Sequence, residues 1–173
     1  MRLTISMRLI WMILIATSAL ACVGLVGYSN TQKLTQDLKF THNTIIANLE
    51  ILSKAESEYL LLRVNGLYHI SYDDPGKKSQ HEAVIKQKVQ NIESLFDQYA
   101  KNTTDANNLQ LLETDKKLFA NYTHALNQIL AKSRENDREG TYQLHENAWK
   151  PAGDKLTQAL NEHRQYNQKL AED

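Results

Sequence analysis

Apolar residues recur at alternating steps of three and four along most of the chain, the spacing of one face of an α-helix. Short polar turns separate four such stretches, which predict helices over about residues 30–72, 79–101, 105–134 and 140–172. Short turns between long helices make neighbouring helices antiparallel. The pattern therefore predicts an all-α fold, an antiparallel up-down-up-down four-helix bundle, with these positions facing inward: Leu38, Ile45, Leu52, Tyr59, Gly66, Ile85, Val89, Ile92, Phe96, Tyr99, Leu112, Phe119, Tyr122, Leu126, Ile129, Trp149, Ala152, Leu156, Ala159, His163, Tyr166 and Leu170.

The second helix is expected to begin at Ser79. Ser79 and Glu82 match a capping box, in which each side chain accepts from a free backbone N–H at the helix start. The preceding Asp-Asp-Pro-Gly-Lys-Lys, residues 73–78, has the composition of a turn.

An uncharged apolar stretch near the N-terminus has two interpretations. As an anchor, residues 9–29 form a transmembrane helix, since about 20 residues cross a bilayer. Arg2 and Arg8 then keep residues 1–8 in the cytoplasm, and residues 30–173 lie outside. As a signal peptide, the stretch is cut after the small-x-small residues 19–21, and Cys22 becomes the new terminus. The apolar run continues through Val26 and Tyr28, which favours the anchor.

Charge and composition exclude several classes of protein. Arg2 and Arg8 account for two of the 20 basic residues, so 18 basic residues face 20 acidic ones in the outer domain. This near-neutral balance predicts no nucleic-acid partner. Cys22 is the only cysteine, so the outer domain has no disulfide. The six histidines form none of the spacings of zinc, di-iron or haem sites, and we expect no metal, no cofactor and no catalytic residues. His163, on an inward row, is expected to be a core histidine.

Three segments carry a resemblance to a known family: residues 7–28, residues 58–74 and residues 136–170. The first is the apolar stretch, the second is EYLLLRVNGLYHISYDD in the first bundle helix, and the third contains Gly140 and Pro151. The chain resembles the bacterial methyl-accepting chemotaxis proteins. The resemblance implies a homodimeric periplasmic sensor in the inner membrane, without enzymatic activity. It also implies a ligand between the first helix of one subunit and the fourth helix of the other, whose small axial shift reaches a cytoplasmic signalling module.

Arg63 is the main candidate for holding a ligand, because it is the one arginine in residues 30–72 and its guanidinium can form a fork with a carboxylate. The alternatives are an ion pair with Glu56 or Asp115, or a side chain whose aliphatic stem lies along the dimer seam. Tyr59, Tyr68 and His69 lie within two turns of Arg63 and complete this group. We expect the ligand to be a small organic acid.

A second group of candidates surrounds Pro151: Asn147, Trp149 and Lys150. A proline inside a helix frees the carbonyl four residues earlier, here that of Asn147, which is then available to a ligand. The alternative is a proline in the first turn of a helix with Trp149 in the core. Weaker polar candidates are Asn65, Tyr142 and Gln143.

The sequence thus predicts the ligand-binding domain of a transmembrane chemoreceptor. Its helical pattern is still running at the last residues, which predicts a second span and the cytoplasmic module further on. The same input domain on a histidine kinase or diguanylate cyclase is an alternative, as is a cleaved periplasmic helical-bundle binding protein.

Overall fold

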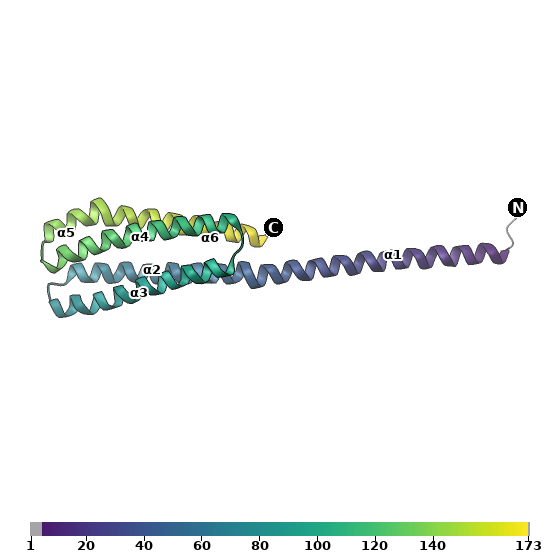
Figure 1. Cartoon of the computed structure of the whole chain (residues 1–173), viewed down its shortest axis with the longest axis horizontal. Helices are drawn as coiled ribbons and strands as arrows, with labels where there is room; N and C mark the ends of the chain where they lie inside the picture. The colour runs from purple at the N-terminus through teal and green to yellow at the C-terminus, as the bar shows by residue number, and fades with distance from the viewer. Residues whose placement is uncertain (1–4, 173) are drawn as a thin grey trace. The chain divides into compact units, whose positions relative to one another are not determined.

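The computed structural model describes residues 5–172, including the side chains of residues 7, 10–35 and 44–172. These residues are almost entirely helical and contain no strand. The elements are α1 (Ile5–Phe40), the π-helix η1 (Thr41–Ile46), α2 (Ala47–Ser71), α3 (Pro75–Asn102), α4 (Ala106–Arg134), α5 (Arg138–Leu144), the π-helix η2 (His145–Trp149) and α6 (Lys150–Glu172). The chain divides into one compact unit that ends at His42 and another that begins at Asn43 (Figure 1).

The first unit consists of α1, whose described side chains are all exposed. Its segment Ile10–Thr35 is long and apolar enough to cross a membrane. The hydroxyls of Thr17, Ser18 and Thr31 donate to backbone carbonyls four residues earlier, at 2.7–2.9 Å. Because their donors are used within the helix, these side chains need no partner from the surroundings.

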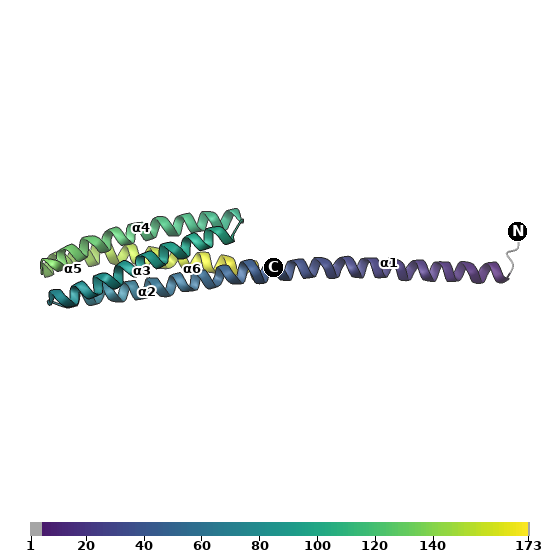
Figure 2. The ribbon, with the colours of Figure 1, turned by 60° about the horizontal axis from the view of Figure 1, so that its bottom comes forward.

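The second unit is a four-helix bundle, as the sequence predicted. Figures 1 and 2 show α2, α3, α4 and the rod of α5, η2 and α6 lying lengthwise beside one another, with successive rods running in opposite directions. The contacts between α2 and α3 and between α4 and α6 are the most extensive. Leu38 lies outside the described side chains.

The start of α3 differs from the prediction. The helix begins at Pro75, not at Ser79, and Asp74 is its N-cap, accepting a hydrogen bond from Lys77 N at 2.8 Å. Proline suits the first helical position, where its missing N–H has no partner to lose. The Asp-Pro signal therefore prevails over the capping box, and only residues 72–74 connect α2 to α3. The ends expected at residues 72, 101, 134 and 172 and the starts expected at residues 105 and 140 lie within two residues of the observed ones. The start expected at residue 30 is wrong, because α1 continues to Phe40 and α2 begins at Ala47.

The fourth rod contains a local widening that the periodicity did not predict. η2 is a π-helical stretch directly before α6, and Lys150 N donates to His145 O across five residues. Pro151 follows in the first turn of α6. A proline clashes with the carbonyl four residues earlier in a regular α-helix. The wider π turn accommodates Pro151 without interrupting the rod.

The core follows the predicted inward rows closely. Its large, fully buried members include Tyr59, Phe96, Tyr99, Tyr122 and Trp149, with aliphatic residues from all four rods between them. The rings of Tyr59 and Tyr122 pack edge to face with centroids 5.1 Å apart. Burying each such side chain contributes roughly 1.5–3 kcal/mol, so packing stabilises the domain without a disulfide among the described residues.

Gly66 lies in close contact with the fourth rod. A Cβ atom at this position would lie 2.8 Å from Cζ2 of Trp149 and 3.1 Å from a methyl of Leu126. The indole fills the space where a side chain would project, so Gly66 is required by close packing and not by its backbone angles.

Candidate functional site

Within one chain, the seven residues predicted to bind a ligand lie in different surroundings. Tyr59 and Trp149 are core residues, 1% and 2% exposed. Tyr59 donates its hydroxyl hydrogen to Gly153 O at 3.0 Å, and burial raises the pKa of this phenol. The indole of Trp149 packs on Gly66 and Tyr122. Because both side chains are buried, neither is accessible to a ligand in this structure.

Arg63 lies at the seam between α2 and α6 and is partly exposed. Its Nη2 is 3.9 Å from Oδ1 of Asp154, so its partner is neither Glu56 nor Asp115, the two expected alternatives. Glu56 lies instead 3.9 Å from Arg164. Thr157, Asn161 and Glu162 border the same shallow depression. Arg63 therefore keeps most of its donors free beside a weakly held carboxylate.

His69 and Tyr68, although adjacent in sequence, occupy opposite environments. His69 is fully buried, and its Nε2 is 2.8 Å from Oε1 of Glu82. Burial lowers the pKa of His69, against the opposing effect of Glu82. Tyr68 is exposed and stacks on His81, with ring centroids 5.3 Å apart.

Of the candidates around Pro151, Asn147 and Lys150 are exposed and Trp149 is buried. Asn147 Nδ2 donates to Oε1 of Gln143 at 3.1 Å, and Lys150 lies 3.5 Å from Oε2 of Glu146. Asn65, one of the weaker candidates, accepts a hydrogen bond through Oδ1 from His81 Nδ1 at 2.9 Å. Only Tyr142 among these candidates lines a sizeable cavity.

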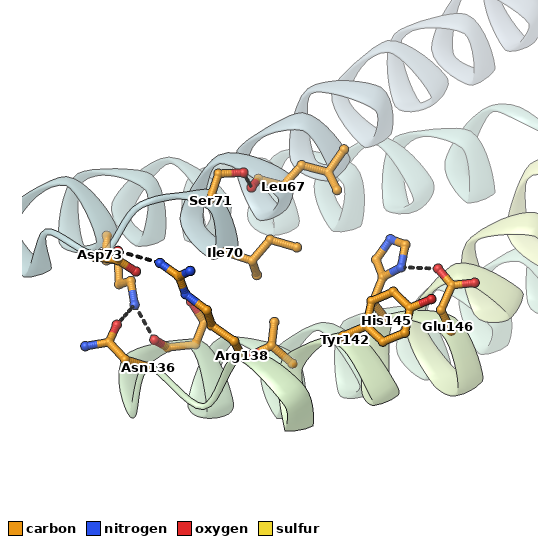
Figure 3. A pocket seen from close by; sticks show the side chains of 12 residues that line it. Leu67, Ile70, Ser71, Asp73, Asn136, Arg138, Tyr142, His145 and Glu146 are labelled. Atoms are coloured by element: carbon orange, nitrogen blue, oxygen red, sulfur yellow. Dashed lines mark hydrogen bonds and ion pairs between the residues drawn. The ribbon is translucent and has the colours of Figure 1, made fainter.

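That cavity, which we call the end cavity, has a volume of about 520 Å³ and lies where α2 ends, α4 ends and α5 begins. Figure 3 shows Asp73, Asn136 and Arg138 at one end of it and Tyr142, His145 and Glu146 at the other, with Ile70 between them. Leu67, Ser71, Lys78, Ser133 and Thr141 complete the lining. The volume falls within the usual range for sites that bind small molecules.

Lys78 is the most unusual residue of the end cavity, and the sequence prediction missed it. Its ammonium donates to Ser133 O and, at 2.6 Å, to Oδ1 of Asn136, which has a left-handed φ of 56°. Thus a cation in the first turn of α3 caps the C-terminal end of α4, where the helix dipole favours positive charge. A lysine in a first turn opposes the dipole of its own helix. This signal was missed because the helix was expected to begin at Ser79, which placed Lys78 in the preceding turn.

The other end of the bundle holds a buried polar network of Tyr99, Asn108, Asp115, His163 and Asn167. His163 Nδ1 is 2.6 Å from Oδ2 of Asp115, and His163 Nε2 is 2.9 Å from the Tyr99 hydroxyl. Asn167 Nδ2 donates to Tyr99 and to Asn108. Burial raises the pKa of Asp115 and of Tyr99. His163 is thus a core histidine, as predicted.

The described residues contain no group of three or more His, Cys, Asp or Glu side chains that is arranged to hold a metal ion. The side chains of the buried polar network hydrogen-bond to one another, although Oδ1 of Asp115 and Oδ1 of Asn167 have no partner, and other polar side chains line the end cavity. This arrangement suits noncovalent binding of a small molecule.

Comparisons with known proteins agree with the architecture. The family model of the four-helix-bundle sensory module for signal transduction matches residues 2–173, which is nearly the whole chain. Comparison with curated proteins gave no match, and comparison with solved structures gave none. The family is a signalling input module and not a catalytic one, and such a module works with a downstream signalling domain. The chain belongs to the four-helix-bundle sensory modules of the methyl-accepting chemotaxis proteins.

Proposed function

We propose that the chain is the ligand-binding domain of a transmembrane chemoreceptor that senses a small organic acid outside the bacterial inner membrane. The family supports a sensory role, and the length and apolar composition of the α1 segment suit a membrane anchor. In this proposal the bundle lies in the periplasm, and an axial shift of α6 carries the signal to a cytoplasmic module.

An exposed apolar stripe on α2 carries the proposal. Leu60, Val64 and Leu67 are 54%, 42% and 40% exposed, at steps of four and three, and Leu61 and Tyr68 extend the stripe along one edge. Helices meet through residues with this spacing, and contiguous exposed apolar surface marks an interaction site. The occupant that we propose is the α2 stripe of a second copy, which gives a homodimer.

Arg63 lies one residue before Val64, between this stripe and α6. Its weak contact with the exposed Asp154 joins α2 to α6. A ligand carboxylate on Arg63 competes with Asp154 and loosens this link, which favours a different axial position of α6. The coupling equals the difference in ligand affinity between the two positions, typically about 1–3 kcal/mol.

Disulfide cross-linking tests the dimer. In the full chain in native membranes, with Cys22→Ser as background, we expect Val64→Cys to give an oxidised dimer, because the two stripes face each other. Gln87→Cys, an exposed position on α3, is the matched control and should stay monomeric. Equal cross-linking at both positions contradicts the proposed interface.

Ligand-induced thermal stabilisation tests Arg63. Succinate is expected to raise the melting temperature of the full chain in detergent, because binding to the folded state stabilises it. Arg63→Ala should abolish the shift, whereas Arg164→Ala, which removes the other arginine at the α2–α6 seam, should retain it. An unchanged shift in Arg63→Ala removes Arg63 from the site.

A further inference from the structure

The end cavity contains a buried positive charge that no carboxylate neutralises directly. Lys78 is only 5% exposed, and no carboxylate of the described residues lies within 4.0 Å of its ammonium nitrogen. Its two hydrogen-bond partners are a backbone carbonyl and an amide oxygen. An ammonium has three donors, so one remains in addition to these two bonds, on a side chain that lines the cavity.

Arg138 supplies a second cation at the same end of the end cavity. One guanidinium nitrogen of Arg138 is 2.8 Å from Oδ2 of Asp73, and the two side chains are 83% and 67% exposed. Exposed ion pairs contribute little free energy, so Arg138 can exchange Asp73 for another carboxylate at low cost. Figure 3 shows Arg138 at the same end of the cavity as Asn136, the hydrogen-bond partner of Lys78. Lys78 and Arg138 therefore form one cationic end of the cavity.

The remainder of the end cavity is suited to an apolar group. Leu67 and Ile70 contribute aliphatic side chains, and Tyr142 contributes a ring. The carboxylate at the far end, Glu146, is already engaged by His145 at 2.8 Å and Lys150 at 3.5 Å. The acidic groups of the lining therefore have partners of their own, and the uncompensated group is Lys78.

We propose that the end cavity is a binding site, contained within a single subunit, for an organic carboxylate with a short apolar or aromatic body. The carboxylate accepts from Lys78 and Arg138, and the body lies against Leu67, Ile70 and Tyr142. This site is separate from Arg63, which does not line the end cavity, and it does not depend on a second copy of the chain.

Such a ligand contacts both halves of the bundle. Residues of α2 and α3 line one side of the end cavity, and residues of α4, α5 and η2 line the other. Binding therefore fixes the α2–α3 hairpin relative to the start of the fourth rod. The alternative role of Lys78 is that of a helix cap alone, which predicts no carboxylate binding.

Calorimetric titration of the full chain in detergent distinguishes the two roles. The probe is 3-phenylpropanoate, with two matched ligands: 3-phenylpropanamide, which keeps the body without the charge, and acetate, which keeps the charge without the body. We expect saturable binding of 3-phenylpropanoate and at least about tenfold weaker binding of both matched ligands, because each lacks one of the two sets of contacts.

Variants locate the site. Lys78→Gln should weaken 3-phenylpropanoate binding by about tenfold or more, and Arg138→Gln by a smaller factor, as expected for charge-assisted hydrogen bonds. Arg138 is exposed, so its variant tests the site even where Lys78→Gln unfolds the bundle, which far-ultraviolet circular dichroism detects. Arg63→Ala should bind 3-phenylpropanoate as wild type does.

Three results overturn the proposal. The first is that 3-phenylpropanoate does not bind saturably to the wild-type chain. The second is that Arg138→Gln binds 3-phenylpropanoate with wild-type affinity, and that Lys78→Gln, if it folds, does so too. The third is that only Arg63→Ala loses binding. The last result assigns the carboxylate to the α2–α6 seam. Conversely, the absence of an Arg63-dependent thermal shift with succinate does not bear on the proposal for the end cavity. The two proposals can therefore fail separately.

Discussion

The two ends of the bundle both gather polar side chains, but those side chains have different partners. In the buried polar network, Tyr99, Asp115 and His163 are at most 1% exposed and hydrogen-bond to one another. Around the end cavity, Arg138 and Glu146 are accessible, and their ion pairs lie at the rim of an open volume. Polar residues of similar chemistry are thus packed into the core at the network end, whereas they line an open cavity at the other end.

This difference separates a structural polar cluster from a candidate binding site. In the buried polar network a ligand has no room and must break bonds that are strong because water is excluded. At the end cavity a ligand replaces water and weak exposed pairs. We therefore expect mutations in the network to act on stability and mutations at the cavity to act on binding.

The largest effect is expected for Asp115→Ala. It removes the partner of His163 Nδ1 in a fully buried position, and breaking a buried pair typically costs about 3 kcal/mol or more of unfolding free energy. Urea denaturation followed by circular dichroism measures this loss. Asp97→Ala is the control, because Asp97 is exposed and pairs with Lys116 at the surface. A loss below about 1 kcal/mol in Asp115→Ala contradicts a structural role for the network.

A smaller effect is expected for Lys78→Met. The change removes two hydrogen bonds to the end of α4 but leaves an apolar stem of similar length, so the loss should be about 1–2 kcal/mol. Lys86→Met, at an exposed position of the same helix, should change the unfolding free energy little. If Lys78→Met costs as much as Asp115→Ala, the cavity end is as rigidly built as the network and the contrast between the ends disappears.

The smallest effect is expected from His69, on the way the free energy of unfolding depends on pH. Burial lowers the pKa of His69 below its ordinary value of 6.5, with Lys78 and Arg134 acting in the same direction and Glu82 against it. The unfolded chain therefore binds the proton first, and stability is lost as the pH falls below about 6.5. Asp115, whose pKa is raised by burial, has the opposite sign: stability is lost as the pH rises above about 3.8.

Replacing His69 with glutamine should remove its part of the acid-side loss. Urea midpoints of the wild-type chain and His69→Gln, compared at about pH 7.5 and about pH 5.5 on either side of the ordinary histidine value, measure this. Parallel midpoints in the two proteins would show that His69 takes up its proton equally in the folded and unfolded chain.

Most of the fold was predictable from the sequence because its signal is local and repeated. Residues such as Ile85, Ile92, Phe96 and Tyr99 are buried at the spacing that the sequence predicted. Short polar turns between the helices then allow few ways to arrange the four rods. The start of α3 was predicted wrongly because two start signals, at Asp74 and Ser79, lie five residues apart, and local rules do not rank them. The π-helical stretch before Pro151 was missed because a single wide turn barely alters the periodicity.

The candidate sites were harder to predict because they depend on contacts between rods. The ion pairs considered as the alternative for Arg63 were with Glu56 on its own helix or with Asp115, but its neighbour Asp154 comes from the fourth rod. The end cavity requires five elements to meet, and nothing in the spacing of Lys78 or Arg138 indicates that they share it. Tyr59 and Trp149 were drawn into the predicted site because an aromatic residue on an inward row has the same pattern whether it is core or ligand contact.

The contact between Gly66 and Trp149 has a consequence for how this protein can vary. Position 66 has room for a hydrogen atom and nothing larger while the indole is present, since an added carbon would meet Trp149 at 2.8 Å. Positions 66 and 149 are therefore expected to change together. Relatives that carry alanine or serine at position 66 should carry a smaller ring or an aliphatic residue at position 149.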